Sequence, residues 1–163
     1  MVSAIQNITT IKNRIKDILT ANTTTLNAFR EKGIVVGLPD NAEFKGLKYP
    51  ICFITNDREL MRAKPFADVA ANVQTLSQQI WSLRIIIMEL KATAQAVETS
   101  LDLLQKQVID ALRDNFTLID PTDLNDALCV MSEITRIENF TIGQLEGKPL
   151  DGRIIKFMVK EIS

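Results

Sequence analysis

Residues 79 to 116, QIWSLRIIIMELKATAQAVETSLDLLQKQVIDALRDNF, decide the fold because two different apolar periods meet in them. The first half alternates with a period of two and places four large apolar residues on one side, at Trp81, Leu83, Ile85 and Ile87. The second half repeats at spacings of three and four, at Val97, Leu101, Leu104, Val108 and Leu112. These patterns predict a β-strand followed by an amphipathic helix over about 94–114 that lies across a sheet.

The second side of the strand is also apolar, since it carries Ile86, Met88 and Leu90. A strand that is apolar on both sides is expected to be buried on both sides, whereas one layer of helices covers only one. Two interpretations follow. In the first, the strand is simply central, or the N-terminal helix and the long helix cover one face each. In the second, the second face is a subunit interface, because exposed apolar patches commonly mark association.

The segments upstream of this stretch predict a helix and two strands. Residues 3 to about 20 carry apolar residues at helical spacings, at Ile5, Ile8, Ile15, Ile18 and Leu19, and predict an amphipathic helix. The run IVVGLP at 34–39 predicts a short strand that ends at a proline. YPICFIT at 49–55 predicts an interior strand that follows a proline.

The segments downstream predict strands and turns. FTLID at 116–120 predicts a short strand and PTDLND at 121–126 a turn. ALCVMSEITRIENFTI at 127–142 and RIIKFMVKEI at 153–162 predict two long strands that pair as an antiparallel hairpin. The intervening GQLEGKPLDG, residues 143–152, has three glycines and a proline and predicts a wide loop.

The predicted fold is a single α+β domain over residues 1–163, in which two helices cover a mostly antiparallel sheet. Its unusual feature is an extended loop at about 61–75, MRAKPFADVAANVQT, with neither a helical nor a strand period. Loops longer than ~12–15 residues inside compact domains are usually functional or flexible. This segment is either a surface loop or a loop that orders against a neighbouring subunit.

The inventory of reactive residues predicts that the chain is not an enzyme and binds no cofactor or metal. The sequence has no histidine, its glycines follow no phosphate-binding pattern, and no cysteine pair has zinc spacing. Cys52 and Cys129 lie in separate apolar runs and are expected to be buried free thiols. The acidic residues of the turn-rich segments are expected to be solvated or to cap turns.

The charge balance argues against nucleic acid as the partner. Nineteen basic and 20 acidic residues leave a net charge of −1, without the clustered basic excess that neutralises phosphates. We therefore expect no sequence-specific nucleic-acid binding. No run approaches the ~20 apolar residues of a membrane span, so we expect no membrane partner either.

The order of elements resembles that of the tail terminator and tail-completion proteins of tailed phages, which serve in head-tail joining. The resemblance is carried by the amphipathic N-terminal helix, the strands YPICFI and WSLRIIIMEL, the long helix and the closing strand GRIIKFMVKEI, and it covers roughly residues 1–162. It implies a structural virion protein, made in the host cytoplasm and resident in the virion tail. In such families a sixfold ring of copies caps the tail tube and contacts the tail-tube protein and the neck or head-completion protein.

The resemblance makes two segments candidates for contacts between copies or with the tube, namely the 61–75 loop and the 143–152 hairpin loop. The candidate interface residues in them are Arg62, Lys64, Phe66, Val69, Val73, Gln144 and Lys148. A neighbouring neck or stopper ring protein is a related alternative. The competing class is a small-molecule or regulatory binding module, in which Arg84 and Glu89 could line a pocket.

Overall fold

The computed structural model describes residues 8–29, 33–38, 47–57, 63–65, 77–129 and 131–162. Its helices are α1 (Ile8–Ala21), α2 (Thr23–Phe29) and α3 (Ala94–Arg113). Its strands are β1 (Ile34–Val36), β2 (Ile51–Asn56), β3 (Ala63–Pro65), β4 (Ser77–Leu90), β5 (Ile119–Asp120), β6 (Asp123–Ala127), β7 (Met131–Leu145) and β8 (Lys148–Ile162).

The large sheet has the strand order β1-β2-β4-β8-β7, and β3 pairs with the N-terminal end of β4. β1 and β2 are parallel and the other pairs of this sheet are antiparallel. The longest ladder joins β4 to β8 from Gln78↔Ile162 to Leu90↔Leu150. The predicted α+β class with a mostly antiparallel sheet is therefore confirmed, and β4 is its middle strand.

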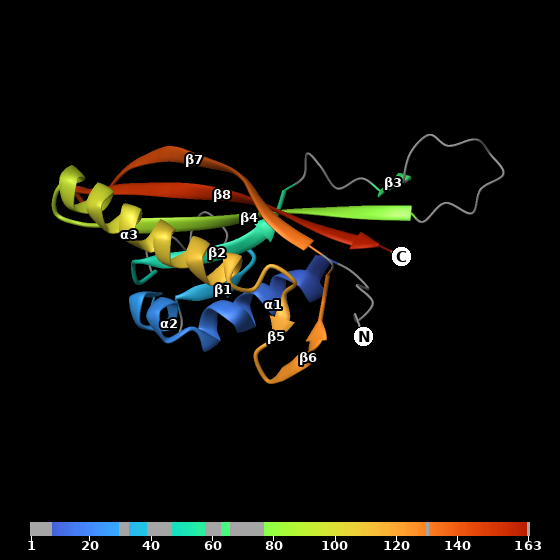
Figure 1. The fold of residues 1–163 in the computed structure, drawn as a ribbon. Coiled ribbons are helices and arrows are strands. Elements are labelled where there is room, and N and C mark those ends of the chain that lie inside the picture. The colour runs from blue at the N-terminus through green and yellow to red at the C-terminus, as the bar shows by residue number, and fades with distance from the viewer. Residues whose placement is uncertain are drawn as a thin grey trace.

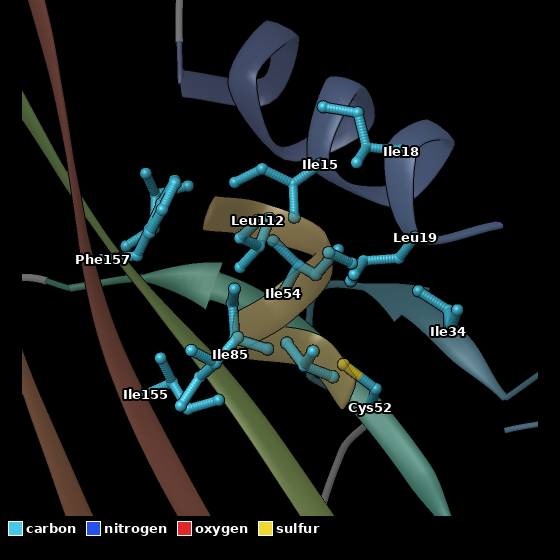
Figure 2. Packing of buried hydrophobic residues seen from close by; sticks show 14 of the residues in the cluster. Ile15, Ile18, Leu19, Ile34, Cys52, Ile54, Ile85, Leu112, Ile155 and Phe157 are labelled. Carbon is cyan, nitrogen blue, oxygen red and sulfur yellow. The ribbon is translucent and has the colours of Figure 1, made fainter. Parts of the chain in front are cut away.

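The helices all lie on one face of this sheet (Figure 1). α3 spans the length that its period predicts, and its first turn is capped by Thr93, whose hydroxyl accepts a hydrogen bond from the amide of Ala96. α1 buries Ile11, Ile15, Ile18 and Leu19. In Figure 2, side chains of α1 and α3 converge with Ile54, Ile85, Ile155 and Phe157 of the sheet in one core.

The alternation of β4 divides its side chains between two clusters. Leu83, Ile85 and Ile87 belong to the helix-side core, whereas Ile86 and Met88 belong to a second cluster on the opposite face. The interpretation in which each helix covers a different face is therefore wrong, and the central position of the strand is correct. The reason is that α1 and α3 both bury their apolar stripes in the same core.

The predicted wide loop at 143–152 is also wrong. β7 continues to Leu145, β8 begins at Lys148, and these two residues are paired in the ladder. Glu146 and Gly147 connect them with φ values of 53° and 78°, the two positive values of a type I′ hairpin turn. The segment is thus a tight turn, and Gly143 marks an irregularity in the ladder at a φ of 111°.

The predicted turn at 121–126 is correct only in its first residues. Pro121 and Thr122 form the turn, and the polar residues that follow form β6, which pairs antiparallel with β5. The carboxylate of Asp120 accepts hydrogen bonds from the amide and hydroxyl of Thr122 and closes this turn. The period gives no signal for β6 because its first three residues are exposed.

The 61–75 segment contains a strand that its composition did not indicate. Residues 63–65 form β3 and pair with 77–79 of β4, so the chain makes an antiparallel β3–β4 pair here. The predicted helix over residues 3–20 is seen from Ile8, and the short strand at 34–39 is β1.

Replacing Ile85 by alanine is expected to lower the free energy of unfolding by about 2–5 kcal/mol, because this fully buried side chain joins the sheet to the helices. Urea denaturation of the variant and the wild type measures the difference. Ile137→Ala, at a site 40% exposed on β7, is the control and should change stability by about 0.5 kcal/mol or less. Equal losses in both variants would contradict the described core.

Burial raises the pKa of the Cys52 thiol from 9.0 to about 12. Between these values the unfolded chain loses a proton that the folded chain keeps, so the thiol's contribution lowers stability as pH rises above 9. We expect the free energy of unfolding to fall more steeply between pH 9 and pH 10 in the wild type than in Cys52→Ala, by about 1 kcal/mol. Urea denaturation at the two pH values tests this, and parallel slopes would exclude it.

Candidate docking pocket on the outer face of the sheet

The face of the large sheet opposite the helices, called the outer face below, carries its own apolar cluster. Its buried members come from β2, β4 and β8 and are Ile51, Phe53, Ile86, Met88 and Leu150. Partly buried residues surround them, among them Tyr49, Phe140 and Ile154. No described helix packs on this cluster, because α1, α2 and α3 belong to the helix-side core.

A pocket of about 490 Å³ opens over this cluster. Its lining is mostly apolar and consists of Leu38, Arg84, Ile86, Met88, Phe140, Ile142, Gln144, Leu145, Leu150 and Ile154. Met88 and Leu150 at its base are buried, whereas Leu38 and Ile142 are 49% and 43% exposed. The volume lies within the range of about 300–1,000 Å³ typical of ligand pockets.

One wall of the pocket depends on a residue without a side chain. Phe140 of β7 is paired with Gly152 of β8, and a Cβ at Gly152 would lie 2.3 Å from the Phe140 ring. The ring therefore lies where any other residue of β8 would place its side chain. Gly152, interpreted from sequence as a loop residue, instead allows an aromatic wall beside the pocket.

Arg84 is the one cation among the described residues that line this pocket. Its Nε is buried and has no hydrogen-bond partner among the residues that the structure describes. Its neighbour across the ladder, Lys156, lies 3.9 Å from a carboxylate oxygen of both Asp57 and Glu138. Lys156 is thus close to two carboxylates, whereas the Arg84 guanidinium has no ion pair with a described residue.

This arrangement favours a guest with an apolar part and an acidic group. The pocket offers apolar area, which drives association without direction, and one guanidinium, whose planar donors suit a carboxylate. A buried polar group without a partner costs stability, so a carboxylate that reached Arg84 would remove part of that cost.

The structure places two of the sequence-predicted interface residues at or near this pocket. Gln144 lines it, and Lys148 is the exposed first residue of β8, directly after the adjacent turn. Lys64 lies in β3, opposite Gln78. Arg62, Phe66, Val69 and Val73 lie outside the described residues.

Arg84 and Glu89 do not share a pocket. Their odd spacing of five along β4 directs them to opposite faces, and Glu89 is buried on the helix side, where it accepts a hydrogen bond of 2.6 Å from the Ser100 hydroxyl. Glu89 therefore serves the junction of β4 with α3. The pocket residues of β7, such as Ile142, were not predicted from the sequence, because the predicted strand ended at residue 142 beside a predicted loop.

A second pocket, of about 230 Å³, lies between α3 and the strands β7 and β8. Its Arg153 already pairs with Asp102 at 2.8 Å and donates a hydrogen bond to Gln105. Its arginine thus has partners within the chain, and the pocket is smaller than the one on the outer face.

Within the described ranges, no cluster of three or more histidine, cysteine, aspartate or glutamate residues could hold a metal ion. Both cysteines are buried and unbonded, as predicted. None of the described helices has the length and apolar character needed to cross a bilayer. No protein-family model matches the chain, and no curated protein matches it either.

Replacing Arg84 by methionine is expected to raise the free energy of unfolding by about 1 kcal/mol, because it removes a buried donor without a partner and keeps the apolar stem. Arg153→Met is the matched control. It breaks an ion pair and a hydrogen bond and should lower stability by about the same amount. Urea denaturation of both variants provides the test, and a loss of stability in Arg84→Met would show that the guanidinium supports the fold.

Proposed function

We propose that this chain is a structural virion protein, a ring-forming tail terminator that caps the phage tail tube and joins it to the head-neck complex. The observation that carries the proposal is the outer face, where an apolar cluster and pocket lie on the side of the sheet that the described helices do not cover. The members at the centre of this cluster are buried, whereas Leu38 and Ile142 at the rim of the pocket are exposed. Exposed apolar residues that gather in this way commonly mark association. The order of elements resembles that of the tail terminator family and supplies the finer assignment.

The shape of the sheet supports a role in assembly. Figure 1 shows the N-terminal end of β4 and the C-terminal end of β8 extending beyond the helices, with β3 beside them. This extension is part of the long β4–β8 ladder, which continues to the pair Gln78↔Ile162. It is suited to reach a neighbouring copy or the tube, and the 61–75 segment that contains β3 retains its proposed role there.

The proposed partners are other copies of the chain, the tail-tube protein and the neck or head-completion protein, with six copies expected from the resemblance. The proposed location is the virion tail. A large protein interface of this kind can form without a reactive residue, because association depends on complementary surfaces.

A second candidate is a module that binds a small amphipathic acid. The observation that favours it is the combination of a pocket of about 490 Å³ with the Arg84 guanidinium. A binding module would remain a monomer or dimer, and its unfolding temperature would rise with ligand concentration.

The test of the proposed function is tube capping. Purified protein is added to polymerising tail-tube protein encoded beside it, and tube lengths and tube ends are measured by electron microscopy. We expect shorter tubes with a ring at one end, because a terminator occupies the surface on which the next tube ring would assemble.

This experiment has two controls. One mixture contains the Ile85→Ala variant, whose core is weakened, in place of the wild type, and the other contains tail-tube protein alone. The proposal fails if tubes grow to the same length with the wild-type protein as without it and their ends stay bare.

A further inference from the structure

A row of three cations crosses the outer face of the large sheet. Arg84 of β4 is paired with Lys156 of β8, and Lys156 is paired with Arg136 of β7. On its other side Arg84 is paired with Thr55 of β2. The row lies on the outer face, because Arg84 is two residues from Ile86 of the outer cluster. Like charges directly opposite each other destabilise a sheet, so a row of this kind needs carboxylates close by.

The carboxylates near this row leave one cation without a partner. Glu138 lies 3.0 Å from Arg136 and 3.9 Å from Lys156, and Asp57 lies 3.9 Å from Lys156. Arg84 has no ion pair with a residue that the structure describes. The row and these two carboxylates therefore combine three positive charges with two negative ones, and the charge that remains is centred on Arg84.

Arg84 and Thr55 are neighbouring donors that both lack an acceptor in the described part of the chain. The Nε of Arg84 and the Oγ1 of Thr55 are buried without a hydrogen-bond partner there, and Thr55 is only 6% exposed. A guanidinium can only donate, and a hydroxyl can donate. The group that would satisfy both is an acceptor, and the oxygens of an ionised carboxylate only accept.

The outer-face pocket adjoins this pair of donors. Arg84 lines the pocket, and Ile86 and Met88 follow it on the same face of β4. Leu150 and Ile154 of β8 add further aliphatic lining. The site thus offers a positive charge next to a pocket lined mainly by aliphatic side chains, which suits a ligand with an acidic head and an aliphatic chain.

We propose that this site binds a monocarboxylate with an aliphatic chain. Its carboxylate accepts hydrogen bonds from Arg84 and Thr55, and its chain lies in the outer-face pocket. A single negative charge matches the single cation that has no partner, whereas Asp57 and Glu138 would repel the second charge of a phosphate monoester. The inference rests on the second candidate function and names its ligand class, and it does not depend on the terminator proposal.

Isothermal titration calorimetry of the purified protein tests the ligand class. The probes are octanoate, octyl phosphate and 1-octanol, which have the same number of carbon atoms and differ in the head group. At pH 8 we expect octanoate to bind at least about tenfold more tightly than 1-octanol, because it adds hydrogen bonds to a charged group. Octyl phosphate carries almost two negative charges at this pH and should bind more weakly than octanoate.

Three variants test the head-group contacts. Arg84→Met removes the charge and keeps the apolar stem, so octanoate should bind at least about tenfold more weakly and 1-octanol equally well. Thr55→Val keeps the shape and removes the hydroxyl, which should weaken octanoate binding about threefold. Arg153→Met is the matched control and should keep the wild-type affinity, since Arg153 lies beside α3 and pairs with Asp102.

Four results would overturn the proposal or a part of it. If octanoate does not bind, or binds no better than 1-octanol, the site recognises no acid. If octyl phosphate binds more tightly than octanoate, the monocarboxylate is the wrong class. If Arg153→Met weakens binding as much as Arg84→Met does, the binding is not localised at Arg84. If Thr55→Val keeps the wild-type affinity, the hydroxyl is not part of the site.

The calorimetry and the tube-capping experiment separate this inference from the proposed function. If tubes are capped and octanoate does not bind, the acid site is wrong and the terminator proposal stands. If octanoate binds with the expected dependence on Arg84 and tubes are not capped, the acid site stands and the terminator proposal fails. If both results are positive, the chain is a terminator that also carries an acid site.

Discussion

The constraint on which this structure depends is that β4 is apolar on both faces and lies in the middle of the sheet. Its odd-numbered residues, such as Ile85, attract the helix layer, because α1 and α3 can bury their stripes only against an apolar surface. Its even-numbered residues, such as Met88, then face away from every described helix. The same alternation therefore builds the core on one side and leaves a second apolar surface on the other.

Arg84 shows how this second surface differs from an ordinary core. A site selected only for the stability of the single chain would carry an apolar residue here or a carboxylate beside the guanidinium, since an unpaired buried donor is unfavourable. The neighbouring Lys156 has two carboxylates close by. A residue that lacks a partner in the described part of its chain and lines a pocket is a common mark of a functional surface.

The sequence by itself determined the elements whose apolar period is strong. The spacing around Val97 and Leu112 predicted α3 nearly to the residue, the alternation around Ile85 predicted β4, and the α+β class followed from their order. The prediction from sequence failed at 143–152, because a glycine shows that a side chain is missing but not which structural need its absence serves. Gly147 serves a tight turn and Gly152 makes room for Phe140. The odd spacing of Arg84 and Glu89 was a signal for opposite faces that could have been used.

The pocket itself was decided only by tertiary structure, because Leu38, Arg84, Ile142 and Leu150 come from separate strands and connections. Their meeting depends on strand order and register, which long-range packing sets and local sequence does not encode.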